Sequence, residues 1–115
     1  LDLPLQNRLW KHEMFLPITT ISKVNNLEEA MQHANEVNYG LASGFYGSEE
    51  ETGWFFDHIE SGVAYANRPQ GATTGAWPGF QPFGGWKASG SSGKNSGGRY
   101  YLPLYMHEQI QTTVR

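Results

Sequence analysis

The stretch Gln81-Pro82-Phe83-Gly84-Gly85-Trp86-Lys87-Ala88-Ser89-Gly90 is the most informative part of this sequence. It lies within residues 69–98, a segment rich in glycine and serine. Such a composition is typical of a long loop with special backbone angles. Aromatic residues, which disordered linkers rarely contain, are interleaved in the segment at Trp77, Phe80, Phe83 and Trp86. The sequence therefore predicts a functional loop that could hold a small ligand.

The residues before this loop alternate between strand and helix patterns. Residues 16–24, 41–46 and 63–66 have the β-branched or apolar composition of short strands. Two segments with helical spacing of apolar residues separate them. Strand, helix, strand, helix, strand with short connections favours parallel β-α-β units. The predicted class is therefore α/β.

Capping residues mark where the two helices begin. Asn26 is placed to cap the first helix, with Glu29 three residues later to return a hydrogen bond, and Gly40 is placed to end it. Ser48 and Glu51 form a capping box for the second helix. After the loop, residues 100–114 return to alternation, which predicts a closing strand pair or one bent strand.

Composition excludes several classes of protein. The net charge is −3 without a lysine or arginine cluster, so a nucleic-acid or anionic-membrane surface is not expected. No apolar run approaches the roughly 20 residues of a membrane span. The sequence contains no cysteine, which excludes disulfides and thiolate metal sites and fits a cytoplasmic protein. Its four histidines are scattered, so no metal site is predicted.

Three separated blocks resemble the aldehyde dehydrogenase family: Glu13-Met14-Phe15-Leu16-Pro17, Asn67-Arg68-Pro69 and the stretch that begins at Gln81. The resemblance covers about residues 8–114. It implies a β-α-β-α-β unit of the catalytic domain, followed by a long glycine-rich loop and C-terminal oligomerisation strands. Residues 1–99 would be the C-terminal part of that domain, and residues 100–115 the oligomerisation-type segment.

The first block implies a cofactor-binding role for Glu13 and Phe15. In the family, the glutamate accepts hydrogen bonds from the hydroxyls of the nicotinamide ribose, and the phenylalanine packs beside the nicotinamide. A carboxylate suits a diol because it only accepts hydrogen bonds. The resemblance thus implies NAD or NADP as the cofactor of the complete enzyme. Asn67 in the second block is more easily explained as a turn former than as a ligand contact.

The region of Thr74-Gly75-Ala76 and the stretch after it are similar to enzymes that oxidise glutamate γ-semialdehyde, the open form of 1-pyrroline-5-carboxylate, to glutamate. In these enzymes, backbone N–H groups of small residues bind the α-carboxylate of the substrate, a role that the resemblance carries to Gly75 and Ala76. Phe83 would form an aromatic wall of the aldehyde tunnel.

The family attacks its aldehyde with a cysteine thiolate, and this sequence has none. The resemblance therefore implies no catalytic residue in this chain and no turnover by the chain alone. The nucleophile, the general base and the dinucleotide-binding half would belong to an N-terminal part of the same enzyme, and a homo-oligomer is expected. Three alternatives stay open: a non-catalytic assembly module that uses its terminal strands, a binder of small carboxylates that uses the loop from Thr74 to Gly85, and an aldehyde dehydrogenase of other substrate preference.

Overall fold

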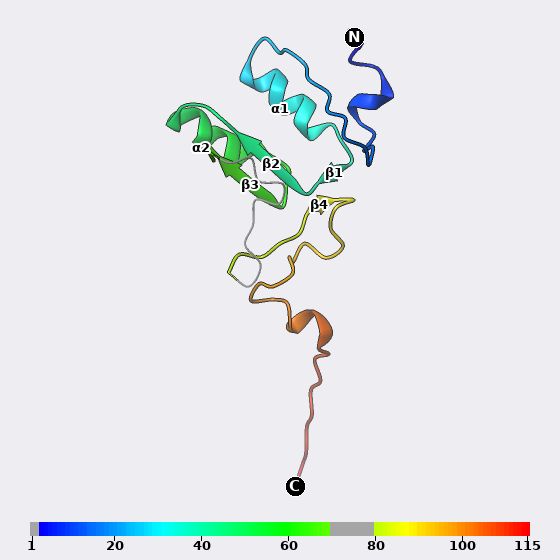
Figure 1. The fold of residues 1–115 in the computed structure, drawn as a ribbon. Coiled ribbons are helices and arrows are strands. Elements are labelled where there is room, and N and C mark those ends of the chain that lie inside the picture. Colours follow the sequence, from blue (N-terminus) through cyan, green and yellow to red (C-terminus); the bar gives the residue numbers. More distant parts are fainter. Residues whose placement is uncertain (1–2, 70–79) are drawn as a thin grey trace.

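The computed structural model describes residues 3–69 and 80–115. Figure 1 shows two helices beside short strands, with a looped segment below them and an extended C-terminal arm. In chain order the elements are the 3-10 helix η1 (Arg8–Trp10), α1 (Leu27–Asn35), β1 (Tyr39–Gly40), β2 (Ala42–Phe45), α2 (Glu49–His58), β3 (Val63–Ala66), β4 (Trp86–Lys87) and the 3-10 helix η2 (Pro103–Tyr105).

The central unit is β2-α2-β3, a parallel β-α-β unit as the sequence predicts. The two strands pair in register from Ala42 opposite Val63 to Phe45 opposite Ala66. The small core lies between this unit and α1, where it gathers the side chains of Met31, Phe55 and Ile59. The rings of Phe45 and Phe55 stack with their centroids 5.1 Å apart, which fixes α2 against β2.

Both predicted helix starts are confirmed by their hydrogen bonds. Asn26 Oδ1 accepts from the Glu29 backbone N–H at 2.8 Å. Glu29 returns its bond to the backbone N–H of Asn25, one residue earlier than a capping box requires. At α2, the capping box of Ser48 and Glu51 is complete.

The first helix ends at Asn35, before the predicted stop at Gly40. Gly40 instead lies in β1, where a Cβ atom would approach the carbonyl oxygen of Glu60 to 2.4 Å. The glycine at this position therefore permits a close backbone approach rather than ending the helix.

A second, antiparallel sheet joins the glycine-rich segment to the rest of the fold. β1 pairs with β4, with Tyr39 opposite Lys87 and Gly40 opposite Trp86. An isolated bridge between Phe83 and Ser96 closes the segment on itself. The predicted long loop is thus partly a strand. Its pairing with β1 joins residues that are about 47 positions apart in sequence.

The predicted strand over residues 16–24 is not formed in the described part of the chain. Two hydrogen bonds between residues two apart, Leu16 N–H to Met14 and Ile18 N–H to Leu16, make consecutive γ-turns at its start. Ile21 is 85 % exposed. A strand needs a neighbouring strand to bond its backbone, and no described residue supplies one here.

The predicted C-terminal strand pair is also absent from the described residues. Residues 100–115 form η2 and then an extended arm, seen in orange and red in Figure 1, and every residue in this range is exposed. The alternation of Leu102, Leu104 and Met106 specifies an apolar face, but nothing in the described structure covers that face. The α/β class, the two helix starts and the β2-α2-β3 unit of the predicted architecture are confirmed, whereas the strand over residues 16–24 and the C-terminal strand pair are not.

Candidate functional site

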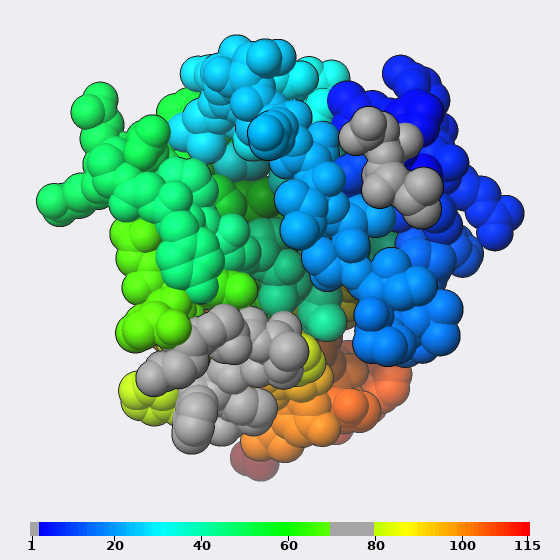
Figure 2. Space-filling view, turned by 45° about the horizontal axis from the view of Figure 1, so that its top comes forward, coloured from blue at the N-terminus to red at the C-terminus, as the bar shows by residue number. Residues whose placement is uncertain are grey.

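A cleft of about 480 Å³ lies between the N-terminal segment and the strands β1 and β2. Glu13, Trp10 and the adjacent residues form one side of it. Gly40 and Ser89 lie on the opposite side, so the glycine-rich segment contributes to the same cleft. Figure 2 shows the N-terminal segment, in blue, lying beside α1 and the strands, in cyan to green. This cleft is the candidate site.

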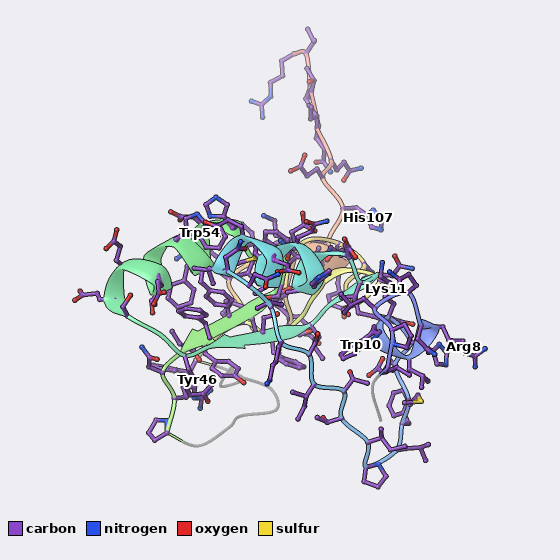
Figure 3. All side chains as sticks on the ribbon, turned by 90° about the horizontal axis from the view of Figure 1, so that it is seen from above. Arg8, Trp10, Lys11, Tyr46, Trp54 and His107 are labelled. Atoms are coloured by element: carbon purple, nitrogen blue, oxygen red, sulfur yellow. The ribbon has the colours of Figure 1, made fainter. Side chains whose placement is uncertain are left out.

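The side of the cleft that carries Glu13 is held by contacts around η1. The indole N–H of Trp10 donates to the carbonyl of Pro4 at 3.0 Å. Lys11 Nζ lies 3.0 Å from the Glu36 carboxylate, just beyond the end of α1. The Lys11 hydrogen bond holds the pKa of Glu36 below its ordinary value, with a further contribution from Gln32. Figure 3 shows Trp10 directed toward the strands, while Arg8 points away.

Glu13 lines the cleft as an exposed carboxylate. It has only acceptor atoms, which suits a ligand with neighbouring hydroxyl groups. Among the described residues, no group of three or more histidine, aspartate or glutamate side chains could hold a metal ion. Glu13 can therefore offer hydrogen-bond acceptors to a polar ligand in the cleft.

Phe15, the other predicted cofactor residue, does not line the cleft with Glu13. Its side chain is 92 % exposed, and it lies within the first of the two γ-turns. The described structure thus brings Glu13 to the cleft but not Phe15.

Phe83 is half-buried and lines a smaller pocket of about 150 Å³. Its backbone exchanges two hydrogen bonds of 2.9 Å with Ser96, which fixes the residue at the base of the loop. Ser89 lines both this pocket and the cleft of Glu13. The two predicted sites are therefore neighbours that share one side chain.

The other two predicted substrate residues, Gly75 and Ala76, lie outside the described residues. Their proposed carboxylate-binding turn would belong to the segment that connects β3 to the loop of Phe83.

A glycine contact fixes the loop against the central unit. At Gly62, a Cβ atom would lie 2.0 Å from the carbonyl oxygen of Gly84 and 2.7 Å from the Cα atom of Gly85. Since real Cβ atoms do not approach backbone this closely, only glycine fits at Gly62. Gly62 thus lets the loop at Gly84 and Gly85 touch the start of β3.

Sequence reasoning missed Lys87, whose ammonium group is the strongest polar anchor of the loop. It donates to the backbone carbonyls of Asn35 and, at 3.2 Å, Val37, and it lies 2.6 Å from the Glu60 carboxylate. The signal available in sequence was a lysine within the glycine-rich segment, which also contains Lys94. Its three acceptors come from distant segments, so sequence alone could not identify them.

Asn67 has the structural role that the sequence favoured. Its side-chain amide accepts from the Gly47 backbone N–H at 3.1 Å and donates to the Gly47 carbonyl at 3.0 Å. Its φ of 50° lies in the left-handed region, which asparagine tolerates better than most residues. The residue therefore shapes the end of β3.

Comparisons with known proteins give a consistent result. The model of the family described as "Aldehyde dehydrogenase family" matches residues 1–110. A 1-pyrroline-5-carboxylate dehydrogenase of Bacillus pumilus is 38 % identical over 112 residues, which are 91 % of this chain and 20 % of that protein. The enzyme of the same name from Bacillus thuringiensis is 36 % identical over 119 residues, 97 % of this chain and 21 % of that protein.

Solved structures show the same likeness. A 1-pyrroline-5-carboxylate dehydrogenase from Thermus with bound NAD aligns with a TM-score of 0.78 and 36 % identity, covering 90 % of this chain and 19 % of that one. Proline utilization A from Bdellovibrio bacteriovorus aligns with a TM-score of 0.80 and 34 % identity, covering 92 % of this chain and 11 % of that one. The chain spans about one fifth of the length of the curated relatives it matches.

Proposed function

The chain belongs to the aldehyde dehydrogenase family, and from this premise we propose that it forms one wall of an aldehyde-oxidising site. The complete enzyme would oxidise glutamate γ-semialdehyde to glutamate with NAD or NADP. The observation that carries the proposal is the position of Glu13 in a cleft that also contains Ser89 from the glycine-rich segment. The names of the relatives at 36–38 % identity support the substrate.

The cleft fits the nicotinamide end of a dinucleotide in size and in chemistry. Its volume of about 480 Å³ lies within the roughly 300–1,000 Å³ of small-molecule sites. The Glu13 carboxylate can accept a hydrogen bond from each hydroxyl of a ribose. The bound dinucleotide would supply the hydride acceptor, and this chain would orient it.

The aldehyde side of the site would use the loop from residue 75 to residue 83. Backbone N–H groups at Gly75 and Ala76 would bind the α-carboxylate of the substrate. The Phe83 ring would exclude water from the reacting carbon. The cysteine nucleophile, which this sequence lacks, would come from an N-terminal part of the same enzyme. The 115-residue chain alone would therefore not oxidise the aldehyde.

A second role, subunit assembly, is favoured by the apolar side chains of the C-terminal arm. Leu102, Tyr105, Met106, Ile110 and Val114 are between 71 % and 96 % exposed. Such a surface, with unpaired backbone, favours pairing with another chain. We propose that the arm joins subunits of a homo-oligomer.

Among the described residues, no helix is long and apolar enough to cross a membrane.

To test the proposal, the complete protein is supplied with glutamate γ-semialdehyde and, in turn, with NAD and NADP. We expect the absorbance of the reduced cofactor to rise with one of them. Propanal, which lacks the α-carboxylate, serves as the matched poor substrate, and Gly75→Val should remove the preference for the semialdehyde. Oxidation of neither aldehyde would contradict the proposed reaction. Oxidation of both aldehydes at equal rates would contradict the proposed substrate and would indicate a general aldehyde dehydrogenase.

A further inference from the structure

Lys87 combines an unusual backbone angle with an unusual set of contacts. Its φ is 52°, a left-handed conformation that is unfavourable for a residue with a side chain. Its ammonium group has three donors, and three acceptors surround it: the carbonyls of Asn35 and Val37 and the carboxylate of Glu60. These contacts hold β4 to the end of α1 against the backbone strain.

The two residues that follow Lys87 are held by backbone hydrogen bonds of their own. The Ala88 N–H donates to the Asn38 carbonyl at 3.0 Å, and the Ser89 N–H closes a tight turn onto Trp86 at 2.9 Å. On its other side, Ser89 touches Gly85, where an added Cβ would come within 2.4 Å of the Ser89 Cβ. Ser89 is therefore confined to one position in the wall of the cleft.

The hydroxyl of Ser89 is only partly used by the protein. Its oxygen accepts from the Gly40 backbone N–H at 3.1 Å. A serine hydroxyl also has one donor, and within residues 3–69 and 80–115 the structure gives this hydrogen no acceptor. Because the oxygen is oriented by Gly40 and the side chain lines the cleft, the hydrogen is available to a ligand there.

We propose that Ser89 is a further ligand-binding residue of the Glu13 cleft, donating a hydrogen bond to the nicotinamide riboside end of the cofactor, and that Lys87 is the positioning residue that holds it there. This inference rests on the proposed function, because that function places the cofactor in the cleft. Glu13 and Ser89 would divide the work: the carboxylate accepts from ribose hydroxyls, and the serine donates to a ligand oxygen.

Cofactor binding to the complete protein tests the role of Ser89 without relying on turnover. Loss of one hydrogen bond to the ligand should weaken the affinity of Ser89→Ala for the dinucleotide about tenfold, measured by quenching of tryptophan fluorescence. Ser92→Ala is the matched control, because Ser92 is an exposed serine of the same segment that does not line the cleft.

A double-mutant cycle tests whether Lys87 acts through Ser89. Lys87→Met should weaken dinucleotide binding about as much as Ser89→Ala, and the double variant should be no weaker than Ser89→Ala alone. Lys94→Met is the control, since Lys94 lies 4.5 Å from the Tyr100 ring and makes none of these bonds. If Lys87→Met does not fold, Glu60→Gln keeps an amide oxygen as acceptor but removes the charge from one of the three contacts, and it should weaken binding two- to threefold.

Unchanged dinucleotide affinity in Ser89→Ala would overturn the role of Ser89. Additive losses in the cycle, or a Lys87→Met variant that binds normally, would overturn the positioning role. A wild-type protein that binds the dinucleotide but oxidises no aldehyde would contradict the proposed function and leave this inference standing.

Discussion

At the scale of single residues, Glu51 shows how one carboxylate defines the start of a helix. It accepts from the backbone N–H of Ser48 at 2.9 Å and from the Ser48 hydroxyl at 2.8 Å, while its own N–H donates to that hydroxyl. The backbone bond, followed by the hydroxyl bond, holds the pKa of Glu51 below its ordinary value. The charged form is therefore the one that caps α2.

A folded-state pKa that is lowered makes the cap sensitive to acid. The contribution of Glu51 is fully present above the pKa of an unfolded glutamate and is lost as the pH falls through the folded-state value. We predict that Glu51→Gln lowers the thermal-unfolding midpoint at about pH 7 and has little effect at about pH 3. Glu50→Gln is the control, because Glu50 makes no such bond. An equal loss at both pH values would contradict a charge-dependent cap.

At the scale of elements, the sequence specified those whose signals are local. The capping residues and the β2-α2-β3 unit form as predicted, because caps and short parallel connections need only neighbouring residues. Residues 16–24 carry strand-like composition but lack a described partner strand, so composition alone was not sufficient.

The sequence named residues of the candidate site, which stay predictions, but it could not give their geometry. Glu13 lies in the cleft and Phe83 beside it, whereas Phe15 is exposed and outside the cleft. The contacts of Lys87 join segments about 50 residues apart. Local sequence patterns do not show which residues that far apart come into contact. Gly75 and Ala76 stay predictions because they lie outside the described residues.

Replacement by alanine should change the stability of the protein in opposite directions at two glycines, Gly53 and Gly62. At Gly53, within α2, an added Cβ meets nothing within 4 Å, so Gly53→Ala should stabilise the protein by about 1 kcal/mol. At Gly62, an added Cβ would lie 2.0 Å from the Gly84 carbonyl oxygen, so Gly62→Ala should destabilise it by roughly 1–3 kcal/mol. Thermal-unfolding midpoints measure both, and stabilisation by Gly62→Ala would contradict the close contact.

At the scale of the whole molecule, the chain is far from compact. Its radius of gyration is 18.7 Å and its longest dimension is 77 Å, whereas a compact domain of about 100 residues has a radius of gyration near 13 Å. The C-terminal arm extends away from the body in Figure 1, and in Figure 3 His107 marks where it leaves. The buried core is small, and many large apolar side chains are left exposed.

Deletion of residues 107–115 should therefore affect assembly more than folding. These residues are exposed and contribute nothing to the core, so the thermal-unfolding midpoint of a dissociated subunit should not fall. We predict a smaller oligomer for the truncated complete protein, measured by light scattering after size-exclusion chromatography. Replacement of the same residues by a Gly/Ser segment of equal length is the control for chain length. An unchanged mass would contradict the assembly role.

The most direct test of the account is the affinity of the complete protein for the proposed nicotinamide dinucleotide when Glu13 is changed. We predict that Glu13→Gln weakens binding about tenfold or more in isothermal titration, because an amide accepts from one ribose hydroxyl less well than a carboxylate accepts from two. Glu28→Gln, on the exposed side of α1 and outside the cleft, should bind like the wild type. Equal affinity of Glu13→Gln and wild type would contradict the claim that this cleft holds the cofactor.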